Sequence, residues 1–149
     1  MTESQPHEQP AGTPNEQPAH LRPGPQSEHV LQHTLARLTS LEDELRVTEG
    51  WLAYGAAFAA YLRLSDTVPA DPDLVRSFQD SYAGAHASMR DVMAVQLEAL
   101  GWTEALDGLR AEHGIPDGFL GWNVIHILGR IHEVYDIVEL DDWFHLFYR

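Results

Sequence analysis

The nine histidines are the first residues that could perform chemistry, because imidazole binds metals and transfers protons near neutral pH. His29 and His33 are four residues apart and could share one helix face, but two ligands make only half of a tetrahedral zinc site. His126 and His132 are six apart, so on one straight helix they point in different directions. The H-E-x-x-H pattern is absent. We therefore expect half-buried or exposed histidines and no metal site.

Other catalytic arrangements are equally sparse in this sequence. Ser81 and Ser88 lie near His86, but neither serine stands in a G-x-S-x-G segment. The glycine-rich phosphate-binding motifs are absent, and the lack of cysteine excludes thiolate chemistry and disulfides. We expect that the protein is not an enzyme and needs no cofactor. An acid-based hydrolase is the weak alternative, since paired carboxylates can meet only in the fold.

The charge balance is the most informative chemical feature. The chain has 23 acidic and 9 basic residues, all nine of them arginine, and a net charge of −14. Such a chain repels nucleic acid and membrane surfaces and suits a partner with a basic groove. The simpler interpretation is a surface that keeps the protein in solution. No signal peptide is recognisable, and the apolar run 51–62 is too short to cross a bilayer, so a cytoplasmic location is expected.

The 149 residues, 44% of them hydrophobic, are enough for one ordinary domain or two very small ones. Residues 1–28 are rich in Pro, Gln, Glu and Gly, which predicts a disordered tail. Residues 29–70 show helical spacing of apolar side chains and predict a small helical subdomain. Ser40, followed by Asp43, predicts that a second helix begins there.

Residues 71–149 predict an acidic domain of the α+β class with a short antiparallel sheet. Asp71 and Pro72 predict a helix start, and residues 78–82 could continue that helix or form a strand. Beyond them we expect three helices, from Ser88 to Gly101, over 103–113 and over 122–130, and a C-terminal hairpin of strands 135–140 and 143–148 around the turn Asp141-Asp142.

The acids of these helices could form a charged array. Asp91 and Glu98 are seven residues apart on one predicted helix, which places them on the same face about 10.5 Å apart. Glu104, Asp107 and Glu112 add a second strip. Exposed carboxylates at such spacing can imitate the phosphates of duplex DNA, although a solvated helix face is the simpler alternative. The full set of candidate partner-binding acids is Asp73, Asp80, Asp91, Glu98, Glu104, Asp107, Glu112, Asp117, Glu133, Asp136, Glu139, Asp141 and Asp142.

A short motif adds a family resemblance. The segment Phe78-x-Asp80-x-Tyr82-x-Gly84-x-x-x-Ser88-x-x-Asp91 resembles the hallmark segment of the ArdA-type antirestriction proteins. The preceding run 58–62, the segment 120–123 around Trp122 and the C-terminal hairpin are also similar, so the resemblance covers roughly residues 30–149. It implies a homodimeric DNA mimic, encoded on a mobile genetic element, that occupies the DNA-binding groove of type I restriction-modification enzymes. It also implies that residues 78–82 form a strand beside the hairpin.

The sequence departs from the family pattern in three places. Gly121 and Asn123 stand where the family has acids beside the tryptophan, and Ile127-Leu128 stands where an arginine-aspartate pair is usual. The Pro/Gln-rich tail stands where the family has an N-terminal αβ domain. These departures leave open a shorter mimic or a relative that binds another basic partner. The main alternative function is a helical interaction module, such as an antitoxin-like or adaptor protein, whose acidity only keeps it in solution and which does not mimic DNA.

Overall fold

The computed structural model describes residues 17–149, which form an α+β fold of six α-helices and a three-stranded antiparallel sheet, confirming the predicted fold class. The predicted disorder of residues 1–16 lies outside the described residues. The elements in chain order are the short 3-10 helix η2 (Ala19–Leu21), α1 (Pro25–Arg37), α2 (Leu41–Leu62), α3 (Leu74–Ser81), β1 (Tyr82–His86), α4 (Met89–Ala99), α5 (Trp102–His113), α6 (Val124–Val134), β2 (Tyr135–Leu140) and β3 (Trp143–Tyr148). No helix within residues 17–149 is long and apolar enough to cross a membrane.

The first helices and the sheet share one hydrophobic core. Phe58 of α2 and Phe78 of α3 are both fully buried and lie edge to face, with ring centroids 5.5 Å apart. Phe147 of β3 joins them at 6.3 Å from Phe78. Because this core contains residues from α1 through β3, packing crosses the predicted boundary between the helical subdomain and the α+β domain.

Strand β3 is the centre of the sheet, whose order is β1-β3-β2. Its pairing with β2 places Leu140 opposite Trp143, so only Asp141 and Asp142 form the turn. Both residues have positive φ, 48° and 66°, as a type I′ hairpin turn requires. The predicted hairpin is therefore correct, although Asp-Asp is an unusual sequence for this turn.

Residues 78–82 divide between the two structures that the sequence left open. Phe78 to Ser81 complete α3, and the strand begins at Tyr82, so the strand implied by the family resemblance is wrong for 78–81. Residues 82–86 do pair antiparallel with β3. Asp71 is not the N-cap of α3, which is Asp73; its carboxylate instead accepts a hydrogen bond from the Asp73 backbone N–H at 2.9 Å.

Residues 17–28 are ordered, so the predicted tail is too long. Pro25 to Glu28 form the first turn of α1, and Ser27 is fully buried. The composition-based prediction failed because a residue far along the chain satisfies the backbone of this segment. The Asp141 carboxylate accepts hydrogen bonds from the N–H groups of Gly24, Gln26 and Ser27 at 2.9–3.0 Å and from the Ser27 hydroxyl.

We call these contacts between Asp141 and residues 24–27 the clasp. The Gln26 side chain returns a bond by accepting from the Asp141 N–H at 2.8 Å. A bend in α2 leaves room for the chain just before the clasp. At this bend Gly55 has φ +51°, and a Cβ there would come within 2.0 Å of the Leu21 carbonyl oxygen. Only glycine fits that position.

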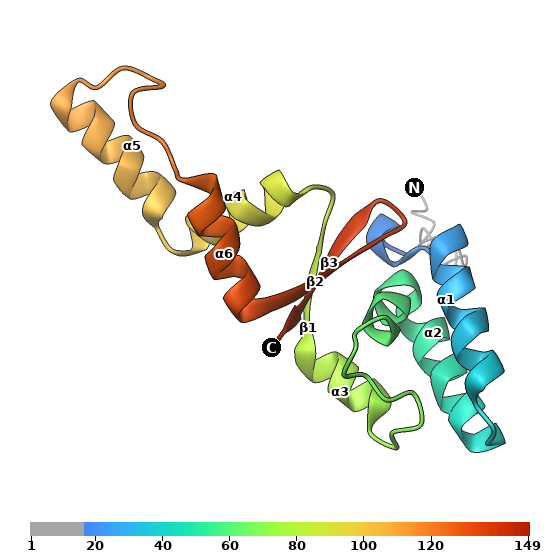
Figure 1. Cartoon of the computed structure of the whole chain (residues 1–149). Helices are drawn as coiled ribbons and strands as arrows, with labels where there is room; N and C mark the ends of the chain where they lie inside the picture. Colours follow the sequence, from blue (N-terminus) through green and yellow to red (C-terminus); the bar gives the residue numbers. More distant parts are fainter. Residues whose placement is uncertain (1–16) are drawn as a thin grey trace, which may run out of the picture.

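We call η2, α1–α3 and the three-stranded sheet the body. The remaining helices project away from it (Figure 1). We call residues 89–134, which contain α4, α5 and α6, the arm. In Figure 1 the arm extends from the sheet, with α5 at the far end and helices α1–α3 on the opposite side of the sheet. A second cluster, centred on Val92, Ile131 and Leu146, fixes α4 and α6 to the sheet.

Candidate functional site

The predicted acidic strips lie on the arm, and their helices match the predicted ends, except that α5 begins at Trp102, one residue earlier than predicted. The Ser88 hydroxyl accepts a hydrogen bond from the Asp91 N–H at 3.1 Å, which starts α4 as a capped helix. Gly101 and Gly114, both left-handed, close α4 and α5. These stops set the lengths of the two helices that carry Asp91, Glu98, and the acids of α5.

Eleven of the thirteen candidate acids are exposed to solvent, and Asp136 and Asp141 are half-buried. The exposed acids fall into two groups. The arm carries Asp91, Glu98, Glu104, Asp107, Glu112, Asp117 and Glu133, whereas α3 and the hairpin carry Asp73, Asp80, Glu139 and Asp142. The structure therefore does not bring all thirteen side chains to one place.

Two of the candidate acids have other partners. Asp136 forms an ion pair with Arg149 at 3.1 Å. Asp141 caps α1 through the clasp. Its partial burial raises its pKa, but the hydrogen bonds from Ser27, Gln26 and Gly24 outweigh that effect and hold the pKa below its usual value. The assignment of Asp141 to a partner-binding surface is thus wrong, because its carboxylate is already used within the fold.

Within residues 89–134, one acid has an ion-pair partner. Asp107 lies 3.4 Å from Arg110, an i to i+3 contact along α5. Pairs of this kind between exposed groups contribute roughly 0–1 kcal/mol to stability. This pair therefore reduces the local negative charge but does not hold the two side chains in place. Asp91, Glu98, Glu104 and Glu112 remain free to meet external cations.

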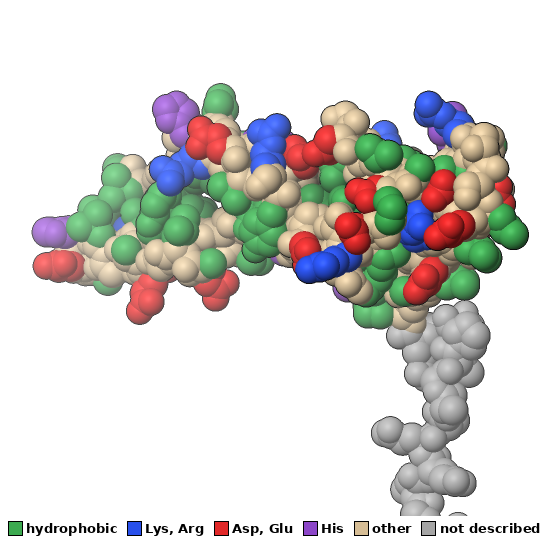
Figure 2. Space-filling view, turned by 90° about the horizontal axis from the view of Figure 1, so that it is seen from below, with side chains coloured by type: hydrophobic (Ala, Val, Ile, Leu, Met, Phe, Trp, Pro, Cys, Tyr) green, Lys and Arg blue, Asp and Glu red, His purple; other side chains and the backbone are tan. Residues whose placement is uncertain are grey.

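The arm also exposes large hydrophobic side chains, which the sequence analysis did not single out as a surface. Phe119 is 77% exposed and Ile125 80% exposed. Helix α5 has no buried residue. The exposed large hydrophobic residues of the arm are Val95, Leu100, Trp102, Leu109, Phe119, Leu120, Trp122, Val124, Ile125 and Val134. In Figure 2 hydrophobic side chains predominate over this end of the molecule, and acidic side chains line its lower edge.

In the helix predicted over 122–130, the spacing of Val124, Ile125 and Leu128 predicts that they face inward, and for Val124 and Ile125 this prediction is wrong. The buried face of α6 is carried by Ile131, with Ile127 packed partly against α4 and the sheet. Helix α6 begins two residues later than predicted, with Asn123 as its N-cap, whose side chain accepts from the His126 N–H at 3.3 Å. Val124 and Ile125 consequently lie in its exposed first turn.

A small apolar pocket of about 150 Å³ lies where the three arm helices meet. Trp102 stacks on Trp122 with centroids 6.1 Å apart, and the guanidinium of Arg130 lies 5.7 Å from the centre of the Trp102 ring. Leu97, Leu100, Ile127 and Ile131 supply most of the remaining wall. These contacts hold the base of α5 against α6.

The histidines do not form a metal centre in the part of the chain that the structure describes, where no three potential ligands converge. His29 and His33 stack on α1 with ring centroids 6.5 Å apart. His145 was not singled out from the sequence, yet it is fully buried in β3, with Nδ1 3.3 Å from the Tyr82 hydroxyl. Burial, with a smaller contribution from His20, lowers the pKa of His145 to about 4, against the opposing influence of Asp141.

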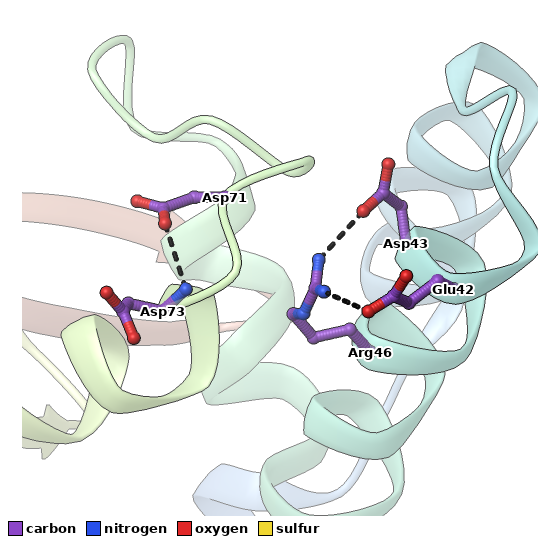
Figure 3. A network of polar contacts seen from close by, with 5 residues as sticks. All are labelled: Glu42, Asp43, Arg46, Asp71 and Asp73. Carbon is purple, nitrogen blue, oxygen red and sulfur yellow. Dashed lines mark hydrogen bonds and ion pairs between the residues drawn. The ribbon is translucent and has the colours of Figure 1, made fainter.

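A second acidic group lies on the body, outside the predicted site. Arg46 of α2 binds Asp43 at 2.8 Å and Glu42 at 3.5 Å, and Asp71 and Asp73 lie across from it (Figure 3). Two carboxylates, those of Glu42 and Asp43, thus pair with the Arg46 guanidinium. Ser40 occupies the N-cap position of α2 as predicted, but without a side-chain hydrogen bond to the helix.

Comparisons of the chain with protein-family models, with curated proteins and with solved structures find no match.

Proposed function

We propose that this protein is an antirestriction protein, which inhibits a type I restriction-modification enzyme by occupying its DNA-binding groove with an acidic arm. The observation that carries the proposal is the exposure of Asp91, Glu98, Glu104 and Glu112 on helices that project from the body. A DNA-binding groove is lined by Lys and Arg, which bind closely spaced negative charges. The family motif at 78–91 supports the same reading.

The apolar surface of the arm supports a homodimer as the active form. Exposed hydrophobic side chains scattered singly are normal, but contiguous apolar areas mark interfaces. Joining two arms through residues such as Phe119 and Ile125 would bury them and place the acids of both copies on one longer array. An elongated array would also match a longer stretch of duplex.

A second candidate function is an acidic interaction module without DNA mimicry. The observation that favours it is the composition of the arm surface, where hydrophobic side chains outnumber acids and three arginines interrupt the charge. In that case the arm binds a partner mainly through apolar contacts, and its affinity depends little on salt.

A competition assay separates the two. The protein is titrated into a type I restriction-modification complex bound to labelled duplex DNA, over a series of salt concentrations. Mimicry predicts displacement of the DNA from a single site, with an affinity that falls steeply as salt rises, because exposed charges are screened over about 10 Å at 0.1 M. Binding without displacement of DNA would contradict it.

Two variants sharpen this assay. In the first variant, five acids of the arm are changed to the corresponding amides, and we expect loss of inhibition with an unchanged melting temperature. The five are Asp91, Glu98, Glu104, Asp107 and Glu112. In the second, the same five positions exchange Asp for Glu and Glu for Asp, which keeps the charge, and we expect inhibition to remain. Asp91→Asn alone should have little effect, since one exposed ion pair contributes roughly 0–1 kcal/mol. Full inhibition by the amide variant would exclude mimicry by the arm.

A further inference from the structure

Helix α2 is apolar on two opposite faces. Before its bend at Gly55, it buries Val47 and Gly50 in the core. Leu41, Leu45 and Leu52 are 71%, 61% and 72% exposed. At roughly 100° per residue, these three leucines lie within about 40° of one another and nearly opposite the buried face. We call them the leucine seam. A helix on the surface of a protein normally places polar residues there.

The spacing of the seam is that of a coiled coil. Steps of four, three and four residues connect Leu41, Leu45, Thr48 and Leu52, which places them at alternating d and a positions of a heptad repeat. Thr48 does not need an external partner, because its hydroxyl already donates to the Glu44 carbonyl at 2.8 Å. The seam is about 16 Å long, or about three helical turns.

Acids flank this seam on both sides. In the same heptad frame Glu42 and Glu49 occupy e positions and Glu44 a g position, and Trp51 fills the remaining g position. Glu42 and Glu49 are exposed, and Glu44 is half-buried. Charges at e and g decide which helix a coiled coil accepts, because they face the corresponding positions of the partner helix.

The charge pattern argues against a second copy as the occupant, and the area is too small for a stable homodimer. Pairing two seams would bring acids at e and g against identical acids. A strip of roughly 16 Å by 10 Å also falls far short of the roughly 800 Å² per partner of a stable interface. The first sixteen residues of the chain offer no repeated large apolar side chains with which to fill it.

We propose that the outer face of α2 is a docking site for a helix of another protein, with leucine-like residues at a and d positions and Lys or Arg at e and g. The partner helix would lie along α2 and bury the seam, while its cations meet Glu42, Glu44 and Glu49. The small area makes this a transient contact. The proposal is independent of the arm, because the seam lies on the far side of the sheet from α4–α6.

The test uses the full chain and two synthetic three-heptad helical peptides with leucine at a and d. One peptide carries lysine at e and g, and the other carries glutamate. Titration calorimetry should give an affinity at least about tenfold higher for the lysine peptide than for the glutamate peptide, a difference of about 1.4 kcal/mol. Absence of binding by the lysine peptide at millimolar concentration would overturn the proposal.

Matched variants separate docking on the seam from attraction to a chain of net charge −14. Changing Leu41, Leu45 and Leu52 to Gln keeps the charge and should weaken the lysine peptide about tenfold. Glu42→Lys with Glu49→Lys should reverse the peptide preference, whereas Glu28→Lys with Asp66→Lys makes the same charge change elsewhere and should preserve it. Equal binding by the glutamine variant, or a lower sedimentation mass of that variant, would overturn the proposal in favour of bulk charge or of a second copy.

Discussion

The two ends of this molecule differ in how far the chain itself provides partners for their polar and apolar groups. At the body end, the clasp gives four hydrogen bonds to one carboxylate, and Gly55 admits the Leu21 carbonyl into a bend of α2. At the arm end, α5 buries no residue, and Phe119 and Ile125 are almost fully exposed. The body covers most of its large apolar side chains within one chain, with the leucine seam as the main exception, whereas the arm has the composition of a surface that another molecule covers. Charge alone does not distinguish them, since both ends carry acids.

The comparison shows that acids in this chain have at least two separate uses. Asp141 and Asp136 hold the fold together through internal partners, while Asp91, Glu98, Glu104 and Glu112 are free. Removing an acid that has an internal partner, such as Asp141, should therefore reduce stability, whereas removing one of these four arm acids should leave it unchanged.

Truncation after Leu140 should have the largest effect. It removes β3, the central strand with which both β1 and β2 pair, and it takes Phe147 out of the first hydrophobic cluster and Leu146 out of the second. We expect the truncated chain to aggregate or to lose its cooperative thermal transition, as followed by circular dichroism. Deleting Arg149 alone is the control and should preserve the transition. A soluble truncated chain with cooperative unfolding would show that the sheet is not needed by the body.

Acid should destabilise the body through His145. Its pKa falls from 6.5 in the unfolded chain to about 4 in the fold, so the unfolded state takes up the proton first. Stability is complete above pH 6.5 and falls as the pH decreases from 6.5 to 4, by roughly 3 kcal/mol for such a shift. His145→Gln should flatten this part of the profile in urea unfolding, whereas His132→Gln, at an exposed position, should not. A steep profile in His145→Gln would assign the loss to other groups.

Asp141→Asn should destabilise the clasp by about 1–2 kcal/mol, the usual contribution of a helix cap. The folded pKa of Asp141 lies below its ordinary value of 3.8, so its contribution is present above pH 3.8 and is lost as the pH falls through the folded value. Urea unfolding at neutral pH measures the change. Asp142→Asn, at the exposed neighbouring turn residue, is the matched control and should cost less. Equal losses in the two variants would show that the turn, and not the cap, needs the carboxylate.

Phe119→Ser with Ile125→Ser should have the smallest effect on the folded monomer. Both side chains already face solvent, so the free energy of unfolding at low protein concentration should change by no more than about 0.5 kcal/mol. Phe58→Ala, in the core, should by contrast cost about 3–5 kcal/mol. Self-association, measured by sedimentation equilibrium, should weaken in the double serine variant. Unchanged association would show that contact between copies does not involve Phe119 and Ile125.

The sequence predicted those elements whose signals are local. Ser88, Gly101 and Gly114 mark helix ends through their own side-chain or backbone chemistry, and the structure places all three where expected. The β-branched and aromatic residues of 135–140 and 143–148 likewise predicted the hairpin. Eleven of the thirteen candidate acids are exposed, as a partner-binding surface requires.

The sequence could not predict what depends on distant contacts. Residues 17–28 have the composition of a flexible tail, and only the approach of Asp141 supplies partners for their backbone N–H groups. The same contact withdrew Asp141 from the candidate surface. The exposure of Val124 and Ile125 was missed for a related reason, because helical spacing shows that a face is apolar but not whether the chain itself provides its cover.

The clasp also has a consequence for the order in which the chain acquires its structure during synthesis. Gly24 and Asp141 are separated by 117 residues, so the ribosome releases the first turn of α1 long before the residue that caps it exists. Until the C-terminal hairpin emerges, α1 has an uncapped N-terminus and lacks part of its core, and a short helix in that state is marginal. Asp141 of the C-terminal hairpin therefore completes α1, and a nascent chain should remain open to proteases near residues 17–28 until that hairpin has emerged.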